Sequence, residues 1–210
     1  MQPIQELDGL RAAIGARLGA PRFRHTLGVE ETAARLGEIY LPHRIRALRI
    51  AALLHDLTKE WSGEEQLAYC EKHCIPITKA ERAAPRILHA KTAAHLAARE
   101  FSAYTDREIL DAIARHTVGA ANLTVFDGII YLADYIEPTR EYPECCRLRD
   151  AFYSGLASCG DETAHFYTIL LRAFRESVAE VEGRGGIVAD ETAGAIAFLE
   201  AELKKRAAGV

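Results

Sequence analysis

The chain has 210 residues, of which 49% are hydrophobic and 27% are charged, a composition typical of one folded domain and not of a disordered segment. Its formal net charge of −4 at pH 7 comes without a basic tail or stripe, which argues against a nucleic-acid partner. No apolar run is long enough to span a bilayer, no signal peptide is recognisable and the five cysteines are unevenly spread, so we expect a cytoplasmic protein with no membrane partner.

Helical spacing recurs along the chain, and no alternating strand pattern or Asn-Gly hairpin is present. Four helices are expected to begin at a capping residue, namely Ser62, Thr78, Thr105 and Thr124. The expected helices cover residues 4–19, 21–40, 43–55, 62–74, 78–85, 86–101, 105–116, 124–137, 143–157, 161–182 and 190–207. This pattern predicts an all-α fold, with one domain over residues 1–210 that forms a bundle of about ten helices.

An imidazole and a carboxylate, His55 and Asp56, stand in the middle of the apolar run of residues 51–59. Charged groups are rarely buried unless they are paired or hold a metal ion. Asp134 raises the same question, because it lies in the apolar segment of residues 129–136. One explanation is a hydrogen-bonded core histidine with an aspartate at the helix end, and the other is a metal site.

Further histidines favour the metal site, because helical bundles build such sites from side chains on several helices. The candidate ligands are His25, His55, Asp56, His89, His116 and Asp134. Four imidazoles and two carboxylates exceed the needs of one tetrahedral zinc ion, so two metal ions are the economical interpretation. Asp56 can bridge two ions about 3.5–4 Å apart, and such a pair attracts phosphate and lowers the pKa of a bridging water towards about 7. Mixed nitrogen and oxygen ligands suit iron, manganese, cobalt or zinc.

The order His25, His55-Asp56, Asp134 resembles that of HD-domain metal-dependent phosphohydrolases, and His89 and His116 are similar to the additional histidines of the dinuclear subset. Four segments within residues 20–150 resemble the YqeK-type bis(5'-nucleosyl)-tetraphosphatases. They are Arg22-x-x-His25-Thr26-x-Gly28-Val29, Leu88-His89-Ala90, His116-Thr117-x-Gly119 and Ala133-Asp134-Tyr135-Ile136-Glu137-Pro138-x-Arg140. Two places depart from the family pattern: Lys91-Thr92, and residues 120–122, which lack a basic residue.

The resemblance implies an HD-domain bundle with an internal dinuclear site. It assigns one metal ion to His25, His55, Asp56 and Asp134, and the other to Asp56, His89 and His116, with iron favoured. It also implies that a metal-bound hydroxide cleaves diadenosine tetraphosphate, a dinucleoside polyphosphate, symmetrically into two ADP. The alternatives are a mononucleotide phosphohydrolase and a non-catalytic nucleotide-sensing module. The complete ligand set argues against the sensor, which needs no activated water.

Basic side chains flank the candidate ligands, as a phosphate site requires. We expect Asp56, Lys59 and Arg140 to act in catalysis, and Arg22, Lys59 and Arg140 to bind substrate, although Arg22 is equally well explained as a solvated charge. Arg115 is interpreted as a structural charge. The residues Cys70, His73 and Cys74 form one helical face without a fourth ligand, and His43, His95 and His165 have no acidic partner, so we interpret these as structural. The helices within residues 151–210 either complete the bundle or form the surface of a homodimer.

Overall fold

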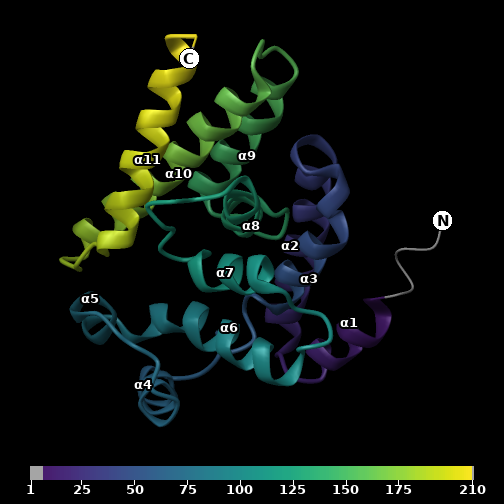
Figure 1. Ribbon diagram of the computed structural model, residues 1–210, viewed down its shortest axis with the longest axis vertical. Coiled ribbons are helices and arrows are strands. Elements are labelled where there is room, and N and C mark those ends of the chain that lie inside the picture. The colour runs from purple at the N-terminus through teal and green to yellow at the C-terminus, as the bar shows by residue number, and fades with distance from the viewer. Residues whose placement is uncertain (1–6, 210) are drawn as a thin grey trace.

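The computed structural model describes residues 7–209, and within this range the chain forms eleven α-helices and no strand (Figure 1). The helices are α1 (Asp8–Gly15), α2 (Ala20–Tyr40), α3 (Ile45–Leu54), α4 (Gly63–Lys72), α5 (Lys79–Ala83), α6 (His89–Glu100), α7 (Arg107–Arg115), α8 (Val125–Ile136), α9 (Pro143–Leu156), α10 (Glu162–Gly183) and α11 (Asp190–Ala207). The prediction of an all-α fold is confirmed. Residues 4–6 of the first expected helix lie outside the described residues.

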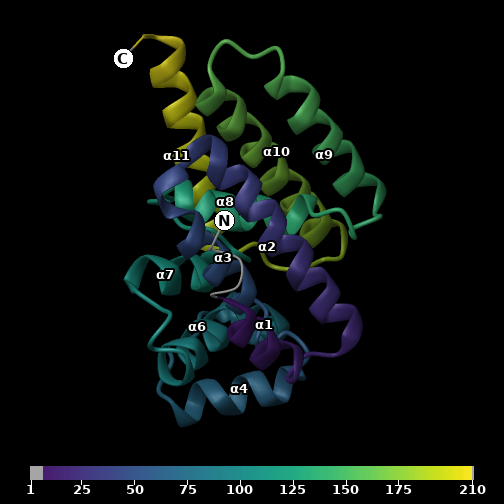
Figure 2. The ribbon, with the colours of Figure 1, turned by 90° about the vertical axis from the view of Figure 1, so that its right-hand side faces the viewer.

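The helices are arranged in three tiers along the longest axis of the molecule. In Figure 1, α1 and α4 to α6 form the lower part, α9 to α11 form the upper part, and α2, α3, α7 and α8 lie between them. Figure 2 shows the same order after a quarter turn, with α4 lowest. The middle helices pack directly on one another, α2 on α3 and α8, and α7 on α3 and α8. Side chains that leave these helices inward therefore meet at the centre of the molecule.

The apolar runs in the sequence form the most deeply buried helices, α3 and α8. In α3, Leu48 and the whole stretch from Ile50 to Leu54 are buried, and α8 buries its residues from Phe126 to Ala133. A helix that is apolar on all sides must be covered on all sides. His55 and Asp134, which belong to these runs, are thereby carried into the interior.

Three of the four expected capping residues begin helices. Ser62, Thr78 and Thr124 each accept a hydrogen bond from the backbone three residues on, in complete capping boxes. The prediction for Thr105 is wrong, because Asp106 caps α7 by accepting from the backbone N–H of Ile109 at 2.9 Å. The hydroxyl of Thr105 points back along the chain and donates to the carbonyl of Phe101. A second expected boundary also shifts, since a 3₁₀ helix (Pro85–Leu88) precedes α6.

The upper helices share one hydrophobic core with the rest of the chain. Phe152 of α9, Phe166 and Phe174 of α10, and Leu199 of α11 are completely buried in the same cluster as the core residues of α3 and α8. None of the described helices has the length and apolar character needed to cross a membrane. All five cysteines are free thiols.

Candidate metal centre

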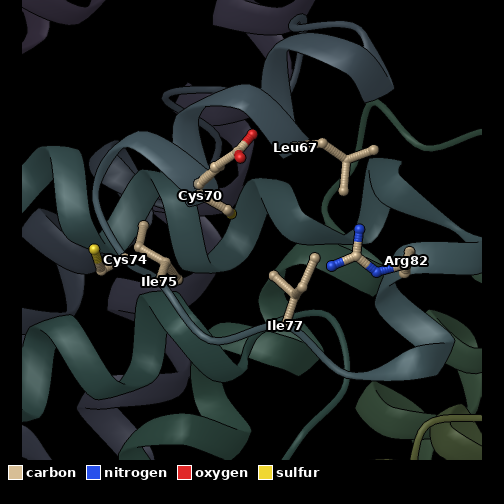
Figure 3. Close-up of a pocket in the computed structure, with 7 residues that line it drawn as sticks. Leu67, Cys70, Cys74, Ile75, Ile77 and Arg82 are labelled. Carbon is tan, nitrogen blue, oxygen red and sulfur yellow. The ribbon is translucent and has the colours of Figure 1, made fainter.

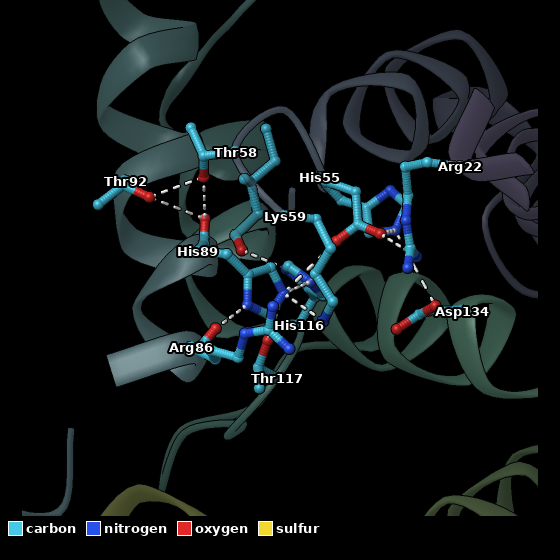
Figure 4. A network of polar contacts seen from close by, with 12 residues as sticks. Arg22, His55, Thr58, Lys59, Arg86, His89, Thr92, His116, Thr117 and Asp134 are labelled. Carbon is cyan, nitrogen blue, oxygen red and sulfur yellow. Dashed lines mark hydrogen bonds and ion pairs between the residues drawn. The ribbon is translucent and has the colours of Figure 1, made fainter. Parts of the chain in front are cut away.

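The six candidate ligands lie together where the middle helices meet, and Figure 4 shows four of them, His55, His89, His116 and Asp134. His25 is on α2 and Asp134 on α8, whereas the other four stand at helix boundaries: His55 and Asp56 follow α3, His89 begins α6 and His116 follows α7. Five of them are buried, and the Asp134 side chain is 18% exposed. Residues far apart in the sequence thus converge on one small volume, and the turn after α3 is at its centre.

Asp56 divides the four histidines into two pairs. Its Oδ2 atom lies 3.7 Å from Nε2 of His25 and 3.4 Å from Nε2 of His55. Its Oδ1 atom lies 3.4 Å from Nε2 of His89 and 3.7 Å from Nε2 of His116. We call His25, His55 and Asp134 with Oδ2 the first half of the centre, and His89 and His116 with Oδ1 the second half.

Donor atoms within each half lie at the separation of ligands on a shared ion or a few tenths of an ångström farther apart. Two atoms each about 2.1 Å from one ion lie about 3–3.5 Å from each other in tetrahedral or octahedral geometry. In the first half, Oδ1 of Asp134 is 3.0 Å from Nε2 of His25 and 3.9 Å from Nε2 of His55. In the second half, the Nε2 atoms of His89 and His116 are 3.0 Å apart.

Backbone carbonyls fix the tautomer of three of the histidines. Nδ1 of His55 lies 2.6 Å from the carbonyl of Ala52, and Nδ1 of His89 and His116 lie 2.7 Å from carbonyls three residues earlier. A carbonyl oxygen only accepts, so each Nδ1 carries the hydrogen and each neutral ring presents the lone pair of Nε2 to the centre. Hydrogen bonds of this kind orient the histidine ligands of metal sites.

The convergence of these lone pairs is unfavourable without a cation. Nε2 of His55 and Oδ1 of Asp56 are buried and have no hydrogen-bond partner among residues 7–209. In the second half, Nε2 of His89 has Lys59 and Thr117 as possible donors, but it also faces Nε2 of His116 at 3.0 Å, and both of these nitrogen atoms are acceptors. Unpaired buried acceptors carry a large desolvation cost, which a bound metal ion removes. The donor set therefore fits metal binding.

Glu137 was not among the predicted site residues, yet it contacts a candidate ligand. The Glu137 side chain is completely buried, and its Oε1 atom accepts from Nδ1 of His25 at 3.0 Å. Thr139 holds the same carboxylate through its backbone N–H and its hydroxyl. The carboxylate reaches His25 only because residue 28 is glycine, since a Cβ atom at Gly28 would lie 2.3 Å from Oε2 of Glu137. The Glu-Pro pair three residues after Asp134 was the available sequence signal.

Burial and neighbouring charges shift the pKa values in opposite directions across the centre. Burial lowers the pKa of His25, but Asp134 and Glu137 outweigh it and raise the value to about 9. Burial, together with Lys59 and His116, lowers the pKa of His89 to about 3. Burial opposes ionisation of Asp134, yet Arg140 and His25 hold its pKa well below the usual range. Among the protein groups themselves, these shifts favour the charged forms of His25 and Asp134 in the first half and the neutral form of His89 in the second half.

Three of the four basic residues singled out in the sequence contact candidate ligands. Nη1 of Arg22 is 2.8 Å from Oδ2 of Asp56, and Nζ of Lys59 is 3.1 Å from Nε2 of His89. Nη2 of Arg140 is 2.7 Å from Oδ1 of Asp134. The interpretation of Arg115 as a structural charge is confirmed by its 2.8 Å pair with Asp127, the acidic member of the α8 capping box.

A buried polar network fixes the turn after α3 to α4 and α6. Thr58 donates to the carbonyl of His89 at 3.0 Å, and its hydroxyl lies 2.7 Å from that of Thr92. Thr92 also donates to Oε1 of Gln66, whose amide nitrogen donates to the carbonyl of Thr58. Thr92, one of the departures from the family pattern, therefore ties together the segments that carry Asp56 and His89. Lys91 pairs with Glu81.

A cavity of about 340 Å³ opens onto the first half of the centre and is lined by cationic side chains. Arg22, Lys59 and Arg140 contribute to its wall together with His25 and Glu137. Another cavity lies between α4 and the segment leading to α5, and Figure 3 shows Cys70, Cys74 and Arg82 on its wall. It contains none of the candidate ligands, so the cationic cavity is the one suited to an anionic substrate.

Two of the remaining histidines make hydrogen bonds away from the centre. His95 is 3.0 Å from the hydroxyl of Tyr69, and His165 donates to the carbonyl of Phe152 at 2.8 Å. Within residues 7–209, Cys70, His73 and Cys74 are absent from the groups of side chains whose donor atoms converge as metal ligands do. Both such groups contain His55, one with His25 and Asp134 and the other with Asp56 and His116.

Comparison with known proteins agrees with this site. A family model described as "HD domain" matches residues 22–139. The symmetrical bis(5'-nucleosyl)-tetraphosphatase of Bacillus subtilis (strain 168) is 36% identical over 132 residues, which cover 63% of this chain and 69% of that protein. The protein of the same name from Staphylococcus aureus (strain NCTC 8325 / PS 47) is 31% identical over 138 residues, covering 66% and 70% of the two chains.

A solved structure extends the similarity to nearly the whole chain. It is the crystal structure of a predicted HD superfamily hydrolase involved in NAD metabolism from Clostridium acetobutylicum, with a TM-score of 0.81 and 30% sequence identity. The match covers 93% of this chain and 97% of the other, so α9 to α11 are included in the shared fold.

Proposed function

The chain belongs to the HD domain family, and from this premise we propose that it is a metal-dependent hydrolase that cleaves dinucleoside tetraphosphates symmetrically, with diadenosine tetraphosphate yielding two ADP. The observation that carries the proposal is the position of Asp56, whose two oxygen atoms face two separate pairs of histidines beside a cationic cavity. The relatives named for this activity support the choice of substrate.

We assign the first metal ion to His25, His55, Asp56 and Asp134, and the second to Asp56, His89 and His116. Oδ2 of Asp56 faces the first set and Oδ1 the second, which is what a bridging carboxylate requires. Imidazole and carboxylate ligands suit iron, manganese, cobalt and zinc, and we propose iron as the working metal. When bound, divalent ions at such a site neutralise phosphoryl charge and acidify a water molecule for attack on phosphorus.

The charge balance of the protein groups explains why a polyphosphate would bind here. The carboxylates of Asp56, Asp134 and Glu137 are matched by the cations of Arg22, Lys59 and Arg140, which contact the ligands or line the same cavity. The charge of bound metal ions is therefore left uncompensated and favours a polyanion. Arginine side chains can also bind phosphate oxygens through two parallel hydrogen bonds.

The protein side chains would act on the substrate in distinct ways. Arg22 and Arg140 would hold phosphate oxygens at the cationic cavity, and Lys59 would stabilise the charge that develops on the departing diphosphate. Glu137 would act through His25 by fixing the orientation of its ring. Attack at an internal phosphorus then releases one nucleoside diphosphate from each end of the substrate.

Product analysis tests the proposal. Protein purified without added metal should contain two metal ions per chain, and hydrolysis of diadenosine tetraphosphate in oxygen-18 water should give only ADP, with label in one of every two molecules formed. Formation of ATP and AMP would exclude symmetrical cleavage. Failure to turn over the dinucleotide, with release of phosphate from AMP, would identify a nucleotidase instead.

The choice of iron has a separate test. An iron enzyme should lose activity on treatment with peroxide and recover it with a reductant and ferrous iron. Full activity of the zinc-loaded protein, unaffected by peroxide, would exclude iron as the working metal and leave the hydrolase proposal intact.

A further inference from the structure

A second cavity, with a largely apolar wall, shares Lys59 with the cationic cavity. It has a volume of about 450 Å³, within the roughly 300–1,000 Å³ that small-molecule sites occupy. Its apolar wall comes from Ile87, Val118, Val178, Val181, Ile187 and Val188. α10 and the segment leading to α11 supply four of these side chains, so this cavity depends on the upper part of the molecule.

Two side chains connect the apolar cavity to the second half of the centre. Lys59 and Thr117 both line it, and they lie 3.1 and 3.2 Å from Nε2 of His89 (Figure 4). The cationic cavity is instead lined by His25, Arg22 and Arg140. Arg22 contacts Asp56, and Arg140 contacts Asp134 of the first half. Each half of the centre therefore has a cavity next to it, and Lys59 lines both cavities.

The apolar cavity has surface that a ligand would cover. Ile187 is 60% exposed and Val181 is 37% exposed, although large aliphatic side chains are usually buried. Polar groups also line this cavity: Tyr131 and Ser177, whose hydroxyls are 3.1 Å apart, and the charged side chains of Glu180 and Arg184. Apolar walls with a few placed polar groups are typical of sites that bind small molecules.

We propose that the apolar cavity binds the nucleoside of one half of the substrate, with its phosphates passing Lys59 towards the metal centre. The proposal rests on the proposed function, in which the cleaved bond lies midway between two identical nucleotides. A substrate of that shape must extend from the centre in two directions, and the two cavities provide them. The base and ribose fit the apolar wall, whereas the phosphates match the cations of the other cavity.

This placement gives the C-terminal segment a role in substrate binding. Ser177, Val178, Val181, Ile187 and Val188 all lie outside the residues that match the HD family model, 22–139. The metal centre can therefore be complete within the matched region, while recognition of the nucleoside depends on α10 and the segment that follows it.

A tryptophan at position 178 tests the inference, because it would fill the cavity. The matched control is Ala179→Trp, on the adjacent exposed residue of α10, which is outside the cavity wall. Calorimetry would measure the binding of ADP and of inorganic pyrophosphate to the metal-loaded proteins. We expect Val178→Trp to weaken ADP binding at least about tenfold and to raise KM for diadenosine tetraphosphate similarly, as for loss of a stacked base. Pyrophosphate binding should stay the same.

The outcomes separate this inference from the proposed function. Unchanged ADP binding by Val178→Trp, or equal weakening of ADP and pyrophosphate, would overturn the nucleoside site even if the dinucleotide is cleaved. Selective loss of ADP binding in a protein that never cleaves the dinucleotide would keep the nucleoside site and overturn the proposed function. An equal effect of Ala179→Trp would also overturn the inference. If Val178→Trp does not fold, Ile187→Asp, a change at an exposed position of the cavity wall, tests the inference through the same measurements of ADP and pyrophosphate binding.

Discussion

The two halves of the centre share Asp56 but differ in the groups that surround them. The first half combines His25 and His55 with the carboxylate of Asp134, and a second carboxylate, Glu137, holds His25 in place. In the second half, backbone carbonyls orient His89 and His116, and no carboxylate other than Asp56 contacts their Nε2 atoms among the described residues. Because carboxylates add negative charge and imidazoles do not, the first half should bind its ion more tightly. The difference between the halves can be tested one residue at a time.

Asp56→Ala should have the largest effect, because it removes the carboxylate that both halves share. We expect loss of both metal ions and a fall in activity beyond the about 10²–10³-fold that follows the loss of one electrostatic group. Elemental analysis and steady-state kinetics would measure the two effects. A chelator should lower the melting temperature of the unsubstituted protein and leave that of the variant unchanged, since ions that bind only the folded state stabilise it. Two retained ions would contradict the bridging role.

His116→Ala should separate the halves, because it removes a ligand of the second half only. We expect about one metal ion per chain and a loss of activity on the order of 10³-fold, at the upper end of the effect of a single electrostatic group. Asp134→Ala is the matching change in the first half. If His116→Ala and Asp134→Ala both lose the two metal ions to the same extent, the prediction that the first half binds its ion more tightly is wrong.

Arg140→Ala should lower activity without releasing metal, since Arg140 pairs with Asp134 but is not a ligand. The expected loss in kcat/KM is about 10²–10³-fold, the effect of removing one positioned electrostatic group. Arg115→Ala is the control, because Arg115 makes an equally close pair with Asp127 outside the centre. Unchanged kcat/KM in Arg140→Ala would return Arg140 to a structural role.

Glu137→Gln should have a smaller effect, because Glu137 acts through His25. Removal of a group that orients a metal ligand typically costs about 10–100-fold in metal affinity or activity. Gly28→Ala should reproduce the loss, because its Cβ atom would lie 2.3 Å from Oε2 of Glu137. Metal titration of both variants measures the effect, and unchanged affinity in the first half would rule out the positioning role.

The sequence predicted the candidate ligands better than the groups that hold them. His55, Asp56 and Asp134 stand out because a charge inside an apolar run needs a partner, and the structure does bring them together in the interior. Glu137 lacks that signal because it follows the apolar run, and only the Glu-Pro pair marks it, a pair that is also common where a helix ends. Its contact with His25 depends on the packing of α2 against α8 and on the space left by Gly28.

Sequence signals between neighbouring residues also predicted most helix starts. They did not predict a functional role for α9 to α11. Ser62, Thr78 and Thr124 were predicted correctly because the partner of each cap lies three residues away in the sequence. At α7, Thr105 and Asp106 are adjacent and both can accept the capping hydrogen bond, and the structure uses Asp106. The apolar cavity joins segments more than a hundred residues apart, such as Lys59 and Val178, and no pattern within either segment indicates this contact.

Thr92→Val should have the smallest effect on activity, and it tests how the second half is held. Thr92 was noted only as a departure from the family pattern, yet its hydroxyl donates to Oε1 of Gln66 and lies 2.7 Å from that of Thr58, which donates to the carbonyl of His89. Valine keeps the shape but leaves buried acceptors unpaired, which should lower the free energy of unfolding by about 1–3 kcal/mol.

The matched control for Thr92→Val is Thr168→Val, because the exposed hydroxyl of Thr168 donates only within its own helix, to the carbonyl of Ala164. Urea unfolding should show a change within about 0.5 kcal/mol for this control. Because the network supports the backbone of His89 and not its ring, Thr92→Val should reduce activity less than Glu137→Gln does. A loss of activity equal to that of Glu137→Gln, without a change in stability, would mean that the second half is positioned as directly as the first.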